Sequence, residues 1–302
     1  MLRLIKSTET MEVDHPVMLI YSDQPGVGRT SLGYMARRVV NLDFDKGSHR
    51  SGNRGDTIQV DHWNDVEELL NVGFGQYETI IPDTVGRCLD LMSLKIMEDN
   101  PKMGYNGNLS KQGWGELKTR WRLFISRLQS LGKDVVLLAH GRADKEGELS
   151  VMRPDIQGGT YSEIMKCADF VGYMYMLDGK HRGIDFSPSD THVGKNPGQW
   201  PVIKVPEYGK DAEFLSKLVD DARSALGRIS EASASIASGI ADWTAKIETL
   251  STPDELNEVL PKVQEITPVI FREQVKRALL KHADKTLMKY DKDTKAFVKA
   301  DA

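Results

Sequence analysis

The sequence predicts an α/β fold, with a mainly parallel β-sheet in the first two thirds of the chain and a helical appendage at the C-terminal end. Short apolar or β-branched runs alternate with helical periodicity up to about residue 140, which is typical of a parallel sheet with crossover helices. A glycine-rich loop follows the first apolar run, and the pattern is helical from residue 210 onward. We therefore expect a core over residues 1–208 and a helical region over residues 209–302.

The strands and helices of the core follow from this periodicity. Strands are predicted at the apolar or β-branched runs 17–21, 39–44, 57–60, 77–81 and 134–140. Helices are predicted at 30–38, 64–71 and 85–97, and over a segment in which apolar residues recur at spacings of three and four from Trp114 to Leu131. Residues 98–111 and 141–159 are polar and contain glycines, so we expect loops there.

The rest of the chain divides into a late strand pair and the helical region. Residues 170–176 and 182–186 are predicted as the strand pair, and residues 195–206 hold three prolines in an irregular stretch. The appendage is predicted to contain a helix over 221–246, a helix that begins near Ser251–Glu255, and a helical apolar stripe from Phe271 to Tyr290.

Composition limits the class of protein. With 40% hydrophobic and 28% charged residues among 302, the chain resembles an ordinary globular protein. It has no apolar run near the roughly 20 residues of a membrane helix, and the N-terminus lacks the pattern of a signal peptide. We therefore expect a cytoplasmic protein without a membrane segment. Cys88 and Cys167 are too few for a disulfide framework or a Cys-only zinc site.

Charge is unevenly distributed, although the net value of −4 gives no global nucleic-acid signal. From Arg272 onward, nine Lys and Arg residues stand against five Asp and Glu residues. This basic stretch is compatible with phosphate contacts, with docking of a partner helix, or with the solvated face of an amphipathic helix.

The glycine-rich loop is the main functional signal. The P-loop pattern G-x-x-x-x-G-K-[ST] binds a triphosphate through backbone amides, a lysine and a Ser/Thr that holds magnesium. The matching segment, Asp23 to Thr30, follows an apolar strand and opens a helix, as the pattern requires. The predicted nucleotide-binding residues are Gln24, Pro25, Gly26, Val27, Gly28, Arg29, Thr30 and Ser31. The alternative is a glycine-rich turn without a ligand.

Two positions of the loop depart from the pattern. Asp23 replaces the first glycine and brings a carboxylate close to the phosphates, and Arg29 replaces the lysine. Arginine keeps the positive charge, but its planar fork is bulkier than an ammonium group and should hold phosphates in a different geometry. Two interpretations therefore stay open, an ATPase or a protein that binds ATP without turnover.

Acidic residues at strand ends supply candidates for the remaining roles. Thr30 and Asp83 are predicted to hold Mg²⁺, although Asp83 could instead cap the following helix. Asp45 is the candidate that positions or activates water, whereas Asp43 is expected to face inward; strand-end aspartates also commonly bond to turn amides. His140 is a candidate sensor of the γ-phosphate, or a strand-end histidine with a structural role.

On these residues the chain resembles the phage-encoded RecA-like ATP-binding proteins, a group that includes single-strand annealing and recombination proteins. The resemblance covers residues 15–208 and rests on five blocks, namely 21–32, 42–50, 83–90, 135–140 and 153–159. It implies that Gly26 to Ser31 bind the triphosphate, that Asp83 serves magnesium, and that an acid near Asp45 acts in hydrolysis. It also implies that Gln157 couples the γ-phosphate to a DNA-facing loop. Such proteins usually carry a polar residue where this chain has Gly141.

The resemblance also implies partners. RecA-like proteins bind single-stranded DNA through loops beside the nucleotide, and the candidate DNA contacts here are Arg142, Lys145, Arg153 and Lys166. A solvated loop with scattered cations is the alternative. We expect ATP and Mg²⁺ as cofactors, a homo-oligomer, and a single-strand-binding or other recombination protein as partner, in the host cytoplasm if the chain is phage-encoded. A scaffold that recruits a partner without turnover is the alternative function, and a small-molecule kinase would need an acceptor pocket that the sequence does not reveal.

Overall fold

The computed structural model describes residues 4–300, which form two compact units: residues 13–226, and residues 4–12 together with 227–300. The strands of the larger unit are β1 (Val17–Ser22), β2 (Val39–Asp43), β3 (Thr57–Gln59), β4 (Thr79–Asp83), β5 (Gly104–Tyr105), β6 (Asn108–Leu109), β7 (Asp134–Glu146), β8 (Leu149–Pro154), β9 (Phe170–Met176), β10 (Arg182–Asp185) and β11 (Ile203–Val205). Its helices are α1 (Arg29–Gly33), α2 (Trp63–Val72), α3 (Val85–Asp99), α4 (Lys111–Ser130), α5 (Thr160–Cys167) and the first part of α6 (Phe214–Glu248).

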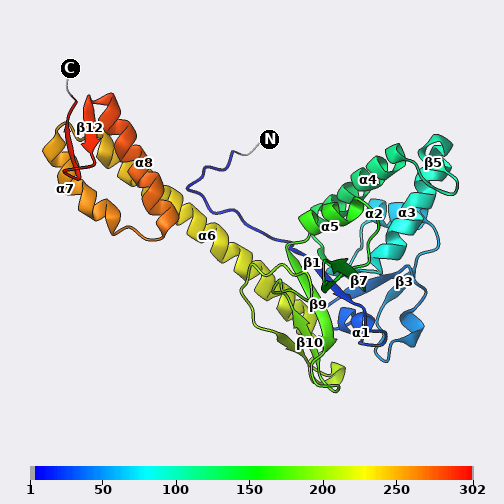
Figure 1. Ribbon diagram of the computed structural model, residues 1–302. Coiled ribbons are helices and arrows are strands. Elements are labelled where there is room, and N and C mark those ends of the chain that lie inside the picture. Colours follow the sequence, from blue (N-terminus) through cyan, green and yellow to red (C-terminus); the bar gives the residue numbers. More distant parts are fainter. Residues whose placement is uncertain (1–3, 301–302) are drawn as a thin grey trace. The chain divides into compact units, whose positions relative to one another are not determined.

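A nine-stranded sheet forms the centre of the larger unit (Figure 1). Its order is β11-β10-β9-β1-β7-β4-β2-β3, and β8 pairs with β7 outside this path. The strands from β9 to β3 are all parallel to their neighbours, whereas β8, β10 and β11 are antiparallel. The predicted α/β class with a mainly parallel sheet is thus confirmed.

Helices cover both faces of this sheet, because its strands are apolar on both sides. In β1, Val17 and Leu19 pack with α2, α3, α4 and α5 on one face. Met18 and Ile20 point the other way and pack with α1 and with the start of α6. Near-continuous apolar runs of this kind are characteristic of parallel strands buried on both faces. The carboxyl ends of β1, β2 and β4 therefore meet at one edge, where the loops carry the polar residues.

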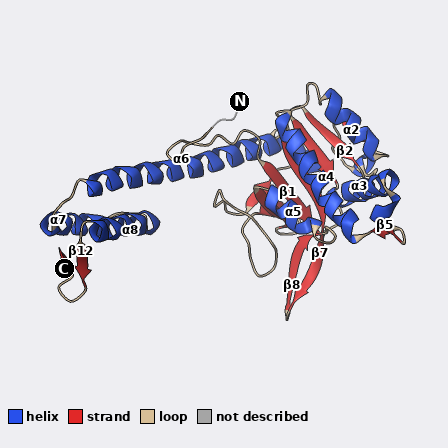
Figure 2. Cartoon of the chain, turned by 90° about the horizontal axis from the view of Figure 1, so that it is seen from above, coloured by secondary structure: helices blue, strands red, loops and turns tan. Residues whose placement is uncertain are grey.

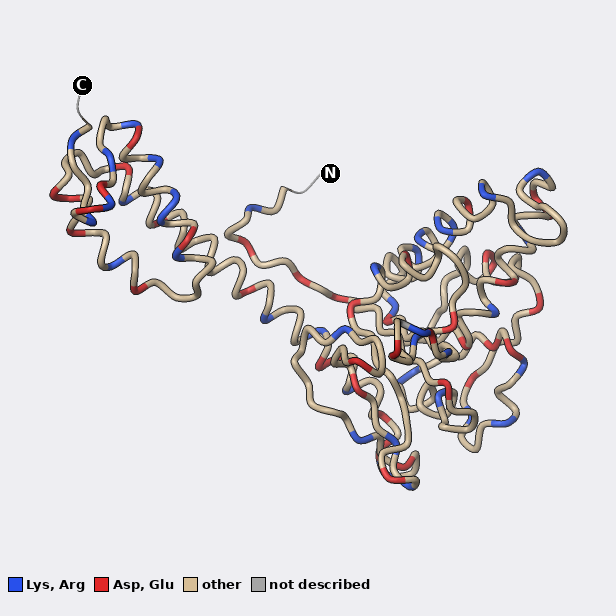
Figure 3. The backbone as a smooth tube through the Cα atoms, viewed as in Figure 1, with Lys and Arg blue, Asp and Glu red and all other residues tan. Residues whose placement is uncertain are grey.

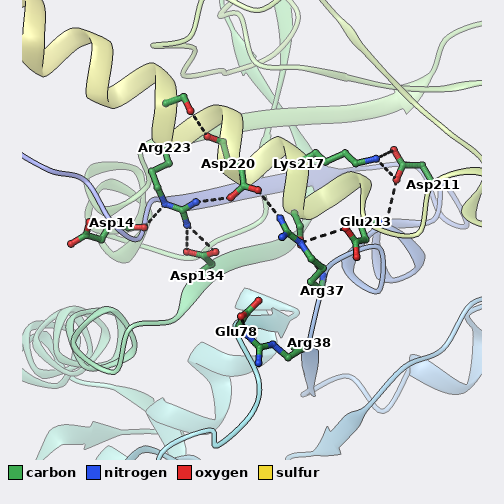
Figure 4. A network of polar contacts seen from close by, with 12 residues as sticks. Asp14, Arg37, Arg38, Glu78, Asp134, Asp211, Glu213, Lys217, Asp220 and Arg223 are labelled. Carbon is green, nitrogen blue, oxygen red and sulfur yellow. Dashed lines mark hydrogen bonds and ion pairs between the residues drawn. The ribbon is translucent and has the colours of Figure 1, made fainter.

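Ion pairs fix the first turns of α6 to the sheet (Figure 4). Arg223 donates to both carboxylate oxygens of Asp134 at the start of β7, at 2.9 and 3.1 Å, and to the carbonyl of Asp14 at 2.6 Å. Asp220 accepts from Arg223 and from Arg37, at 2.6 Å each. The boundary expected from the sequence, at residue 208, lies in the short 3-10 turn that precedes this helix.

The helix predicted over 30–38 is shorter in the structure, since α1 ends at Gly33. The backbone beyond it bonds to α6 and does not continue the helical ladder. Met35 accepts from the amide of Leu215 at 2.8 Å, and the amide of Arg37 donates to Ser216 Oγ at 2.7 Å. Contacts with a distant segment, which local propensity does not report, therefore end the helix.

The loops predicted over 98–111 and 141–159 contain regular structure. Strand β7 continues past His140 and pairs with β8 as a hairpin that extends from the sheet (Figure 2). Gly147 forms its turn with φ of 64°. In the earlier segment Asn106 and Gly107 turn a two-residue hairpin, β5–β6, with φ of 48° and 77°. The short helix α5 and the edge strand β11 were also missed, since each is brief and rich in polar neighbours.

The second unit has its own core. The C-terminal part of α6 packs with α7 (Pro253–Gln264), α8 (Val269–Lys285) and the hairpin β12 (Met288–Asp291) with β13 (Ala296–Lys299) around the buried residues Ile247, Leu256, Val259, Val263, Val275, Leu279, Ala283, Met288 and Phe297. The prediction that Tyr290 continues a helical stripe is wrong, because α8 ends at Lys285 and Leu287 turns the chain with φ of 56°. Acidic and basic residues are interspersed along this unit (Figure 3). Across residues 4–300, no helix combines the length and apolar composition that a membrane crossing needs.

Candidate nucleotide site

The glycine-rich loop connects the carboxyl end of β1 to the N-terminus of α1, as predicted. Gly26 and Gly28 have φ of 74° and 94°, a region in which residues with a side chain are strained. Gly28 is also sterically confined, because a Cβ there would lie 2.7 Å from Nη1 of Arg182. The loop lines a cavity of about 360 Å³ together with residues 50–52 and with Asp83, Thr84 and His140. Amides of such a loop at a helix N-terminus form an anion-binding cradle.

Thr30 and Asp83, the two predicted magnesium ligands, are in direct contact. The Thr30 hydroxyl donates to Asp83 Oδ2 at 2.7 Å. Asp83 closes β4, which is separated from β1 by β7 alone, and only 5% of its surface is exposed. Burial raises the pKa of Asp83, as do the neighbouring charges of Asp45 and Asp43, whereas the Thr30 bond and the charge of Arg29 lower it. A hydroxyl and a carboxylate are hard oxygen donors, which fit Mg²⁺ when phosphate oxygens complete its shell.

Arg29 does not point freely into the cavity. Its Nη1 donates to the carbonyl of Ser22 at 2.5 Å, and its Nη2 lies 2.8 Å from Nδ1 of His140. Burial lowers the pKa of Arg29, while the charges of Asp83, Asp45 and Asp23 raise it. Because a guanidinium can only donate, Nδ1 of His140 must accept, so the proton of the neutral ring resides on Nε2. That nitrogen lies 3.3 Å from Asp45 Oδ2 and donates to it.

Asp45 therefore receives hydrogen bonds from two sides. Besides His140, the hydroxyl of Thr84 donates to Oδ2 at 3.2 Å, and Nε of Arg87 lies 3.6 Å from Oδ1. Burial by itself raises the pKa of Asp45, but the bonds from His140 and Thr84 and the charges of His140 and Arg87 outweigh it and lower the pKa. The carboxylate is thus ionised and oriented at the wall of the cavity.

Asp43 has a different environment from Asp45. It is 1% exposed and accepts from the amides of Gly47 and Ser48, at 3.0 and 2.9 Å. These bonds shape the turn that follows β2, so this acid holds backbone in place.

The two residues that begin the loop are tied to β9. The Asp23 carboxylate accepts from the hydroxyl of Tyr173 at 2.7 Å, and Gln24 Oε1 accepts from the amide of Met176 at 3.2 Å. The glycine after His140 is explained here too. A Cβ at Gly141 would lie 2.6 Å from the backbone nitrogen of Asp23, so a polar side chain at this position has no room.

The remaining predicted residues lie farther from the loop. Gln157 lines a second cavity of about 660 Å³, which shares Asp45, Arg50, Thr84 and His140 with the first. Arg142, Lys145 and Arg153 lie on the β7–β8 hairpin, and Lys166 is exposed on α5. The hairpin cations alternate with acids, since Arg142 pairs with Asp144 at 3.2 Å and with Asp155 at 3.6 Å.

Sequence reasoning missed several residues at the site. Thr84 and Arg87 follow Asp83 directly, and their contacts with Asp45 come from pairing of β2 with β4 in register, Asp43 opposite Asp83. Arg50 and Ser51 approach the loop through the turn after β2, where Ser51 Oγ lies 2.8 Å from Ser31 Oγ. Their proximity to the quoted motifs was the available signal.

Comparisons with known proteins agree with this arrangement. Residues 14–197 match the family model described as an AAA domain. Among solved structures, a KaiC-like protein from the hyperthermophilic archaeon Pyrococcus horikoshii OT3 is 10% identical, with a TM-score of 0.31 over 66% of this chain and 99% of that one. Another solved ATPase domain is 11% identical, with a TM-score of 0.34 over 64% and 80% of the two chains. The comparison with curated proteins gave no match. Since the matched segment spans more than half of its length, the chain belongs to the AAA domain family.

Proposed function

We propose that this chain binds ATP with Mg²⁺ and hydrolyses it. The observation that carries the proposal is the 2.7 Å bond between Thr30 and Asp83. In P-loop nucleotidases, these two residue types hold the magnesium ion that bridges the β- and γ-phosphates. Their contact at the floor of a cavity lined by the glycine-rich loop supports the same use here. A bound magnesium ion would neutralise developing charge on the phosphates.

Asp45 is proposed to orient the attacking water. Its carboxylate is ionised, lies at the cavity wall and is held by His140 and Thr84. A residue with this task must be able to accept a hydrogen bond from water within reach of the phosphate. The role of His140 in this scheme is to position Asp45, and a contact of its own with the γ-phosphate is not required.

Release of inorganic phosphate tests turnover. We expect Mg²⁺-dependent release by the unmodified chain, and a change of rate in Arg29→Lys, because that substitution breaks the contacts with Ser22 and His140. Asp23→Gly should have the smaller effect, since the Asp23 carboxylate is bonded to Tyr173. No release by the unmodified chain under saturating ATP and Mg²⁺ excludes hydrolysis.

The second candidate is a protein that binds ATP without turnover and recruits a partner through its C-terminal unit. The favouring observation is the orientation of Arg29, whose guanidinium is bonded to Ser22 and His140. A loop cation that is held in this way is less available to the γ-phosphate. Tight ATP binding without phosphate release, in the unmodified chain and in Arg29→Lys, would support this candidate.

We further propose that the ATP-bound protein acts on single-stranded DNA in phage recombination or annealing, as a homo-oligomer and with a single-strand-binding or other recombination protein. The support is the resemblance to RecA-like recombination proteins, with Lys145 and Lys166 as exposed cations. Binding through phosphate contacts must weaken as salt rises. A titration of labelled single strands at several salt concentrations, with and without ATP, tests this. Absence of binding at low salt in both states would refute it.

A further inference from the structure

The candidate nucleotide cavity is rich in negative charge. Asp43, Asp45 and Asp83 all line it, and a bound triphosphate tail adds about three to four further charges. A P-loop lysine usually contributes a compensating cation. Arg29 stands at that position, but its two terminal nitrogens are bonded to Ser22 and His140. Another cation is therefore needed at the phosphates.

Arg50 is placed to provide that charge. It ends the 3-10 turn Ser48–Arg50 and lines both the loop cavity and the adjoining larger cavity. Within residues 4–300, no side-chain hydrogen bond or ion pair of Arg50 is found, whereas Arg87, also beside Asp45, is paired with Asp45 and Asp90. Arg182 approaches Gly28 from β10 but does not line the loop cavity.

The backbone that carries Arg50 is held in place on several sides. The Asp43 carboxylate accepts from Gly47 and Ser48, and the amide of Arg50 donates to the Gly47 carbonyl at 3.0 Å. The next residue, Ser51, contacts Ser31 of α1. The guanidinium packs directly over Gly47, where a Cβ would lie 2.5 Å from Nη2. The absence of a side chain at Gly47 thus leaves the guanidinium its place beside the cavity.

We propose that Arg50 binds the terminal phosphate of the bound triphosphate, while Arg29 positions His140 and, through it, Asp45. This assignment rests on the proposed function. A planar guanidinium can donate two parallel hydrogen bonds to one phosphate, a geometry that a lysine ammonium does not offer. The usual task of the single loop lysine is thereby divided between two arginines from different segments.

Discrimination between triphosphate and diphosphate tests the assignment. Calorimetric titration with the non-hydrolysable analogue β,γ-imido-ATP and with ADP, both with Mg²⁺, gives the affinities of wild type, Arg50→Gln and Arg50→Lys. Loss of a charge-assisted contact to phosphate should weaken the triphosphate analogue about 10- to 100-fold in Arg50→Gln. The affinity for ADP should change less than about threefold, and Arg50→Lys should retain most of the triphosphate preference.

Arg54 supplies the matched control, because it is an exposed arginine on the same segment that lines neither cavity. Arg54→Gln should leave both affinities unchanged. If Arg50→Gln weakens both nucleotides equally, or neither, the assignment of Arg50 is overturned and the proposed function stands. If wild-type protein binds neither nucleotide, the proposed function fails and the assignment fails with it.

Discussion

At the scale of single residues, the site separates carboxylates by their environment. Asp43 bonds to turn amides, Asp83 is buried against Thr30, and Asp45 lies at the cavity wall with bonds from His140 and Thr84. The motif and the strand ends identified these acids from the sequence. Their partners could not be identified in that way, because Thr84 and His140 reach Asp45 only through the register and order of three strands.

Asp45→Asn should separate binding from turnover. The amide keeps the size of the carboxylate but loses its charge and its ability to accept a proton, so phosphate release should fall about 100-fold or more. ATP affinity should change only a few-fold, because Asp45 is not expected to touch the phosphates. Asp90→Asn, in an exposed acid of α3, is the control and should leave the rate unchanged. An Asp45→Asn variant with wild-type turnover would remove Asp45 from the mechanism.

Asp83→Asn should uncouple ATP binding from magnesium. An amide oxygen can still accept from Thr30, but it lacks the charge that a divalent cation requires. The affinity for ATP with Mg²⁺ should fall about tenfold or more, towards the value measured with a chelator. Parallel calorimetric titrations in the two conditions measure this. An unchanged benefit from Mg²⁺ in the variant would show that Asp83 does not serve the metal.

At the scale of elements, the sequence predicted what local patterns determine. The strands that flank the loop were found because each is a short apolar run buried on both faces, and α4 because its apolar residues repeat at helical spacing. The β7–β8 hairpin was missed because its strands are polar and carry few apolar residues. The early end of α1 was missed because bonds to Leu215 and Ser216, far along the chain, cause it.

Gly141 joins two of these elements, and Gly141→Ala tests its role. A Cβ there would meet the backbone of Ser22 and Asp23 at 2.9 and 2.6 Å, and backbone cannot move aside as a side chain can. We expect a loss of about 1–3 kcal/mol of stability. ATP affinity should also fall, because the displaced residues begin the loop.

Thermal denaturation and calorimetric titration measure both effects of Gly141→Ala. Gly115→Ala provides the contrast, since Gly115 lies in α4 with open space around its Cβ position. That substitution should stabilise the protein by about 0.5–1 kcal/mol. Equal behaviour of the two variants would contradict the steric explanation of Gly141.

At the scale of the whole molecule, the chain contains separate hydrophobic cores in its two units. The sequence anticipated a helical region after the core. It could not show that α6 contributes to both units, because an uninterrupted helical pattern carries no sign of the change at residues 226 and 227.

Differential scanning calorimetry should therefore show two unfolding transitions. ATP with Mg²⁺ at 100 times its Kd should stabilise the unit that binds it by about 2.7 kcal/mol. The midpoint of that transition should rise by about 5–10 °C, and the other should not move. Leu256→Ala, in the core of the second unit, should lower only the other transition. A single transition that responds to both changes would contradict independent cores.

The central claim is that the loop from Gln24 to Ser31, with Thr30 and Asp83 below it, binds a magnesium-bound triphosphate. Equilibrium titration of the unmodified chain with ATP, in the presence and absence of Mg²⁺, measures this most directly. The account predicts saturable binding of one ATP per chain, with an affinity at least about tenfold higher when Mg²⁺ is present. A folded protein that gives no binding signal in either condition would contradict it.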